Sequence, residues 1–166
     1  GANFNEKNFV KTIRNIRYII ENFEKFYKQY GFESSLKSPT IGFVGRGPYN
    51  AISEDAALKF REMAMIHSFG YSAAEFLHGP IGAYKKGDFV FLLSPSKKLS
   101  QDLILVRDKL KEKEVSCLVI YPFSDNYPFN SLEVDILLKL VALKFAVIRG
   151  LNPDNPKGLT KITHTL

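Results

Sequence analysis

Three ionisable residues, Asp55, Lys59 and Glu62, follow one another at spacings of four and three residues. In an α-helix these spacings place the side chains on one face. A carboxylate, an ammonium and a second carboxylate in a row can hold and move protons, as general acid–base chemistry requires. The same pattern is typical of a solvated helix face laced by ion pairs, each worth roughly 0.3–0.5 kcal/mol. Spacing alone favours this second interpretation.

The surroundings of the helix favour a functional role. An apolar run at 41–44 is typical of a buried strand, and Gly45, Arg46 and Gly47 then predict a tight loop before the helix. A strand, a glycine loop and a helix N-terminus together form a concave site with free backbone N–H groups and a positive dipole end. Ligands of open α/β sheets bind at this end of the strands. We therefore expect the three loop residues to contact a ligand.

Strands alternate with helices along the rest of the chain. The apolar runs are typical of parallel strands buried on both faces, and the intervening segments have helical periodicity. This alternation predicts an α/β fold, a three-layer, doubly wound parallel sheet of flavodoxin-like type with an N-terminal helix. The expected strands are 40–45, 88–93 and 115–121, with a short extended piece at 68–72. The first expected helix follows the glycine loop and ends near residue 67, and the later helices span 73–77, 100–114 and 131–149.

The N-terminal segment, 5–30, is expected to be one long amphipathic helix that ends at Gly31. We favour a helix packed across the sheet, and a helix that forms a dimer contact is the second interpretation. Its apolar stripe consists of Phe9, Ile13, Ile16, Ile20, Phe23, Tyr27 and Tyr30.

Composition limits the possible classes of function. The chain has 166 residues, 45% of them hydrophobic and 24% charged, which suits one globular domain. A net charge of +6 suits an anionic ligand, but no dense basic cluster or zinc-finger spacing indicates nucleic acid. The charged residues in 131–149 argue against a membrane span. The lone Cys117 predicts a core thiol and a cytoplasmic protein, and we expect no metal or cofactor.

The motifs together resemble those of the sugar isomerase (SIS) domain. They are most similar to the second SIS domain in the isomerase half of glutamine–fructose-6-phosphate aminotransferases. The resemblance implies a single SIS domain over 1–166, with a leading helix and loop (1–39), an α/β core (40–150) and a tail that reaches the active site (151–166). The residues that carry it are, in family order, Gly45-Arg46-Gly47, Ala57-Leu58-Lys59 with Glu62, Ile66-His67, Glu75, His78-Gly79-Pro80 and the tail segment 154–161.

The resemblance also implies a reaction, aldose–ketose isomerisation of a sugar phosphate through an enediol. In this family's pattern Glu62 is the base that moves the carbon-bound proton, and Lys59 acts at the oxygens. His78 corresponds to the histidine that opens the sugar ring from a neighbouring subunit, and Lys161 to the lysine that approaches the carbonyl. Asp55 stands where the family has a substrate-side glutamate.

Three differences from the family leave alternatives open. The chain has no glutaminase part, it lacks the serine/threonine-rich loop that holds the sugar phosphate in the first SIS domain, and Lys157 replaces an arginine of the tail. The phosphate then binds at the Gly45–Gly47 loop, on a homodimer partner or on another SIS domain. An isomerase of hexose or amino-sugar phosphates is the first hypothesis. A non-catalytic sugar-phosphate-binding module, or one half of a two-SIS-domain enzyme, is the second, and an interaction domain is the third.

Overall fold

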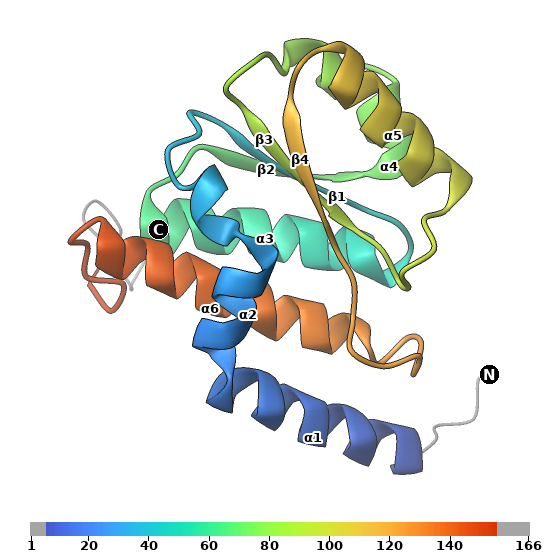
Figure 1. Ribbon diagram of the computed structural model, residues 1–166, viewed down its shortest axis with the longest axis vertical. Coiled ribbons are helices and arrows are strands. Elements are labelled where there is room, and N and C mark those ends of the chain that lie inside the picture. Colours follow the sequence, from blue (N-terminus) through green and yellow to red (C-terminus); the bar gives the residue numbers. More distant parts are fainter. Residues whose placement is uncertain (1–5, 156–166) are drawn as a thin grey trace, which may run out of the picture.

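A computed structural model of the chain, which describes residues 6–155, confirms the expected α/β fold (Figure 1). Four parallel strands form one sheet in the order β2-β1-β3-β4. The elements are α1 (Glu6–Glu21), α2 (Phe23–Tyr30), η1 (Phe32–Ser35), β1 (Ile41–Gly45), α3 (Pro48–Ala64), β2 (Ser68–Ser72), α4 (Ala73–Leu77), η2 (Pro80–Ala83), β3 (Phe89–Leu93), α5 (Gln101–Glu112), β4 (Ser116–Ile120) and α6 (Ser131–Ile148).

The two central strands, β1 and β3, explain the continuous apolar runs in the sequence. Every residue in both is buried, because helices cover both faces of a parallel sheet. Ile41 of β1 pairs with Ser68 of β2 on one side and with Phe89 of β3 on the other. From β1 the chain therefore passes to β2 on one side of β1 and then crosses back to β3 on the other side. The carboxyl ends of β1 and β3 mark the topological switch point, where open α/β sheets bind ligands.

Helices α3 and α6 cover one face of the sheet, and α4 and α5 cover the other, so the sheet is the middle of three layers (Figure 1). Phe60 of α3 is fully buried at the centre of the first interface. Its ring centroid lies 4.9 Å from that of Phe43 in β1 and 5.6 Å from that of Phe145 in α6. This aromatic cluster holds α3 and α6 in place against the strands.

The N-terminal segment contains two helices, so the expectation of one helix over 5–30 is wrong. The break is at Asn22, whose backbone has φ −116° and ψ 20°. Its backbone N–H and its side-chain amide both donate to the Tyr18 carbonyl, at 3.0 and 2.9 Å. Asparagine often forms such local bonds in place of regular helix bonds. The expected end at Gly31 is confirmed, with φ 67° in the left-handed region.

The buried side of α1 also differs from the expected stripe. Helix α1 packs along α6, on the side of α6 away from the sheet, so the expectation that it packs across the sheet is wrong (Figure 1). Thr12 and Ile19 are its buried residues, whereas Ile13 and Ile20 are 48% and 52% exposed. The heptad-like spacing therefore does not identify the buried face of α1, because the face that packs against α6 also contains polar side chains. Among these, Asn15 donates to the Glu133 carboxylate at 2.7 Å.

Helix α3 ends three residues before the expected position. Met65 takes the left-handed conformation, with φ 52°, and the N–H of Ile66 donates to the Phe60 carbonyl at 3.1 Å. His67 consequently lies in the connection to β2, where its ring is 4.7 Å from that of Phe69. The sequence predicts that helix α3 ends near residue 67, but His67 lies outside the helix. The short helix α4 begins as expected, with the Ser72 hydroxyl accepting from the Glu75 N–H at 3.2 Å.

A buried carboxylate holds the loop that follows β4. Glu133, in the first turn of α6, is fully buried. It accepts from the N–H of Phe123 at 2.7 Å, and from the N–H and hydroxyl of Ser124 at 3.1 and 2.7 Å. With Asn15 these donors satisfy the carboxylate, as burial requires. The contacts fix both α1 and the β4–α6 loop at the carboxyl side of the sheet.

Candidate functional site

The glycine loop joins β1 directly to α3 at the switch point. A Cβ atom on Gly45 would lie 2.3 Å from the Tyr49 carbonyl oxygen, so only glycine permits this close approach of strand and helix. Gly47 has φ 58° and precedes Pro48, which occupies the first turn of α3. Local sequence thus dictates a tight turn here. The turn leaves the Arg46 side chain 68% exposed at the carboxyl edge of the sheet.

Arg46 has a partner that the sequence did not reveal. Its Nη1 lies 3.3 Å from Oδ2 of Asp102, in the first turn of α5. The other oxygen of Asp102 accepts from the Leu103 N–H at 3.0 Å and from the Ser100 hydroxyl. A carboxylate is favourable at the positive end of a helix. The Asp102 carboxylate of this chain therefore already lies beside Arg46, where an anionic ligand would be expected to bind.

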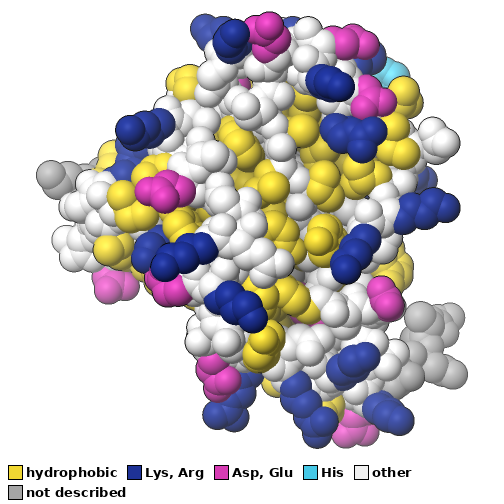
Figure 2. Space-filling view, viewed as in Figure 1, with side chains coloured by type: hydrophobic (Ala, Val, Ile, Leu, Met, Phe, Trp, Pro, Cys, Tyr) yellow, Lys and Arg dark blue, Asp and Glu magenta, His cyan; other side chains and the backbone are white. Residues whose placement is uncertain are grey.

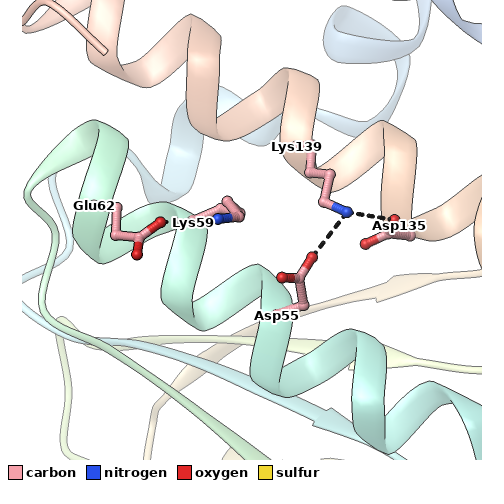
Figure 3. A network of polar contacts seen from close by, with 5 residues as sticks. All are labelled: Asp55, Lys59, Glu62, Asp135 and Lys139. Atoms are coloured by element: carbon pink, nitrogen blue, oxygen red, sulfur yellow. Dashed lines mark hydrogen bonds and ion pairs between the residues drawn. The ribbon is translucent and has the colours of Figure 1, made fainter. Parts of the chain in front are cut away.

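The second cluster lies along the C-terminal half of α3 (Figure 3). The Nζ atom of Lys59 donates to Oε2 of Glu62 at 2.8 Å, one turn along the helix. The two side chains are 30% and 37% exposed, so the pair is partly shielded and still reachable by a ligand. A carboxylate beside an ammonium is chemically suited to remove a carbon-bound proton while charge on a neighbouring oxygen is stabilised.

Asp55 belongs to the same face of α3 but binds a residue of α6. Its Oδ2 is 2.9 Å from Nζ of Lys139, which also donates to Oδ2 of Asp135 at 2.7 Å (Figure 3). Sequence reasoning missed Lys139 and Asp135, because nothing in the pattern specified that this face of α6 would lie against α3. Their spacing of four residues on a helix, with an acid before a lysine, was the available signal.

The shared ammonium affects the two aspartates differently. Burial alone would raise the pKa of Asp55, but the hydrogen bond and charge of Lys139, with smaller effects from Asp135 and Lys59, lower it overall. Burial raises the pKa of the more enclosed Asp135 and outweighs the opposing effect of Lys139. Burial would lower the pKa of Lys139, yet its two carboxylate partners raise it. Asp55 is therefore the more readily ionised carboxyl group of the pair.

The structure brings the expected site residues together in two groups, not in one. Asp55, Lys59 and Glu62 share a face of α3, and the glycine loop lies at the N-terminus of the same helix. Since a helix rises about 1.5 Å per residue, Glu62 is about 21 Å along the axis from Pro48. The glycine loop and Glu62 therefore lie near opposite ends of α3, with Asp55 between them.

The other two expected residues are also separate from Glu62. His78 is exposed at the C-terminal end of α4, and α4 packs on the opposite face of the sheet from α3. Lys161 lies outside the described residues. Within 6–155, no group of three or more His, Cys, Asp or Glu side chains is arranged to hold a metal ion. Cys117 is half-buried on the edge strand β4, where burial raises the pKa of its thiol.

Over the described range, no helix has the length and apolar character needed to cross a membrane. Lys and Arg side chains are spread over the face seen in Figure 2, with hydrophobic side chains exposed between them. On this face the basic side chains of the described residues do not gather into the single dense patch that is typical of nucleic-acid-binding domains.

Comparisons with known proteins identify the family of the chain. The family model described as "SIS domain" matches residues 36–126. The glutamine–fructose-6-phosphate aminotransferase (isomerizing) of Sulfolobus acidocaldarius is 29% identical over 156 residues, which cover 88% of this chain and 26% of that protein. The chain thus spans about a quarter of the length of such relatives.

Solved structures share the fold. The C-terminal domain of glucosamine-fructose-6-phosphate aminotransferase from Francisella tularensis superposes with a TM-score of 0.69 and 20% identity, over 87% of this chain and 46% of that one. Tagatose-6-phosphate ketose/aldose isomerase from Escherichia coli superposes with a TM-score of 0.73 and 16% identity, over 97% of this chain and 49% of that one.

Proposed function

Because the chain belongs to the SIS domain family, we propose that it is a sugar-phosphate isomerase-type domain. Its substrate is a hexose or amino-sugar phosphate of the fructose 6-phosphate and glucosamine 6-phosphate class. The observation that carries this proposal is the Lys59–Glu62 pair, a 2.8 Å contact on a partly exposed helix face. A binding module without turnover has little use for a base held beside a cation.

The chemistry of the proposal is proton transfer between adjacent carbons. Glu62 takes the proton from the carbon next to the carbonyl, which leaves an enediolate, and returns it to the former carbonyl carbon, while the hydroxyl proton moves from one oxygen to the other. The Lys59 ammonium stabilises the negative charge that develops on the oxygens during both transfers. His78 opens the sugar ring, and Lys161 polarises the carbonyl or condenses with it. Gly45, Arg46 and Gly47 contact the substrate, as does Asp55.

The separation of these groups favours a complete site that includes a second SIS domain. Glu62 and the glycine loop are about 21 Å apart along α3, and His78 follows α4, which packs on the other face of the sheet. A complete site then combines groups from two domains, either two copies of this chain or this chain and a different SIS domain. Two copies should appear as a dimer in light scattering, whereas a monomer that is active alone would contradict this part of the proposal.

A specific observation favours the second candidate function, a binding module or one half of a two-SIS-domain enzyme. Asp102 already pairs with Arg46 and lies in the first turn of α5, at the positive end of the helix. A substrate phosphate at this edge would meet a carboxylate, so the phosphate is better held by another domain.

Deuterium exchange distinguishes these candidates. The protein is incubated with fructose 6-phosphate in deuterium oxide, and the protons at C1 and C2 are followed by NMR. Exchange is the result expected for an isomerase whose site is complete in this chain or its homodimer. Line broadening of the sugar phosphate without exchange would instead support a binding module. Neither exchange nor binding, across a panel of hexose and hexosamine phosphates, would contradict the proposed function.

A further inference from the structure

We propose that Lys139 is a positioning residue for the Lys59–Glu62 pair, because it binds Asp55 and so leaves Lys59 to bind Glu62. The inference rests on the proposed function for its catalytic meaning, but the arrangement of ion pairs can be tested without turnover. Lys139 comes from α6 and has no place in the motifs that identify the domain.

The helix itself favours a different pairing. Lys59 stands between two acids on one face, with Asp55 four residues before it and Glu62 three residues after it. In helices, an acid that precedes a lysine by four residues forms a better pair than the reverse order, which also agrees with the helix dipole. An isolated α3 would therefore tend to pair Lys59 with Asp55. The folded protein has the opposite arrangement, with Lys59 bound to Glu62 at 2.8 Å.

The contacts of Lys139 supply the reason. Its Nζ atom is 2.9 Å from Asp55 and 2.7 Å from Asp135, and Asp135 is only 12% exposed (Figure 3). The enclosed Asp135 lies one helical turn before Lys139 on α6 and holds the ammonium in place. Lys139 thereby gives Asp55 a cation from outside α3, and Asp55 competes less strongly for Lys59.

The other charged groups near this face have partners elsewhere. Arg61 of α3 donates to the Ser68 carbonyl in β2, and Lys144 of α6 binds Glu24 of α2 at 2.7 Å. Glu54 accepts from Asn50 on the same helix. Strands β1 and β2, which also pack against α3, contain no Asp, Glu, Lys, Arg or His. The choice of partner by Lys59 therefore depends on Lys139.

The test compares Lys139→Met, Lys139→Arg and the double variant Asp55→Asn/Lys139→Met with the wild type. Two readouts are used, the 13C chemical shift of the Glu62 carboxyl carbon at neutral pH and the pH profile of deuterium exchange into fructose 6-phosphate. Lys139→Met should change the Glu62 shift and move the acidic limb of the profile to higher pH, because Lys59 then turns to Asp55 and Glu62 loses its ammonium partner. Lys139→Arg should retain both wild-type values.

The double variant separates positioning from simple packing. Removing the Asp55 charge removes the competitor for Lys59, so the Glu62 carboxyl shift should return to its wild-type value although Lys139 is absent. A shift that stays altered in the double variant, or a Lys139→Met protein with an unchanged Glu62 shift, would overturn the inference. Loss of exchange in every protein, including the wild type, would contradict the proposed function instead, and the carboxyl shifts would still decide the role of Lys139.

Discussion

The Arg46 guanidinium lies 3.3 Å from the Asp102 carboxylate, across the carboxyl ends of β1 and β3. A residue expected to attract the substrate is thus paired with an acid of its own chain. The Arg46 side chain is 68% exposed, so the ion pair is weak and another anion can replace Asp102 beside Arg46.

Asp102→Asn should strengthen the binding of fructose 6-phosphate by roughly fivefold, because a carboxylate no longer competes for Arg46. The asparagine oxygen can still accept from the Leu103 N–H, so the start of α5 should be preserved. Titration followed by phosphorus NMR measures the affinity. The gain should disappear in Arg46→Gln/Asp102→Asn. Equal affinities for the wild type and Asp102→Asn would argue against a role for Arg46 in binding.

Glu133→Ala should lower the free energy of unfolding by about 3 kcal/mol, since it leaves buried backbone N–H groups without an acceptor. Urea denaturation monitored by circular dichroism measures the loss. Glu112→Ala, at an exposed position on α5, should change stability by less than about 0.5 kcal/mol and serves as the control. Similar stabilities for both variants would show that the Glu133 contacts do not hold the β4–α6 loop.

Phe60→Ala should destabilise the protein by about 3–5 kcal/mol, because it opens a cavity between β1, α3 and α6. Thermal denaturation, with Phe69→Ala on the exposed edge strand as a matched control, checks the value. Phe69 is 37% exposed, so Phe69→Ala should lower the free energy of unfolding by much less. A loss of under about 1 kcal/mol for Phe60→Ala would mean that the aromatic cluster contributes little.

The Asp55–Lys139 contact should make stability depend on pH at the acidic end. The folded-state pKa of Asp55 is lowered, so the ionised carboxylate stabilises the fold above the unfolded value of about 3.9, and this contribution is lost as pH falls through the folded value. Wild type should therefore exceed Asp55→Asn in stability at pH 7 by less than about 1 kcal/mol, given its exposure, and lose that advantage near pH 2. Urea titrations at both pH values test this, and a difference that grows on acidification would contradict it.

Much of the fold follows from local sequence. The buried runs of β1 and β3 and the glycine loop were predictable, because parallel strands leave near-continuous apolar segments and tight turns require glycine. The break at Asn22 was not, because a side chain that competes for one carbonyl leaves the apolar periodicity intact.

The candidate site was predictable only in part. The shared face of Asp55, Lys59 and Glu62 is a property of one helix, and it was foreseen from spacing. The role of Lys139 and the Arg46–Asp102 pair depend on how separate elements pack, which spacing does not encode. The same limit applies to the distance between the glycine loop and Glu62. A motif gives the order of its residues along the chain, but it does not show whether they contact the same ligand.

The central proposal, that Glu62 is the base of an isomerase, is tested most directly by Glu62→Gln. Glutamine keeps the shape of the side chain but cannot take a proton from carbon, so exchange at C1 and C2 of fructose 6-phosphate in deuterium oxide should fall at least about 100-fold. Glu54→Gln, on an exposed position of the same helix, should exchange like the wild type, and all three proteins should unfold at similar urea concentrations. Wild-type exchange by Glu62→Gln would contradict the assignment of the base.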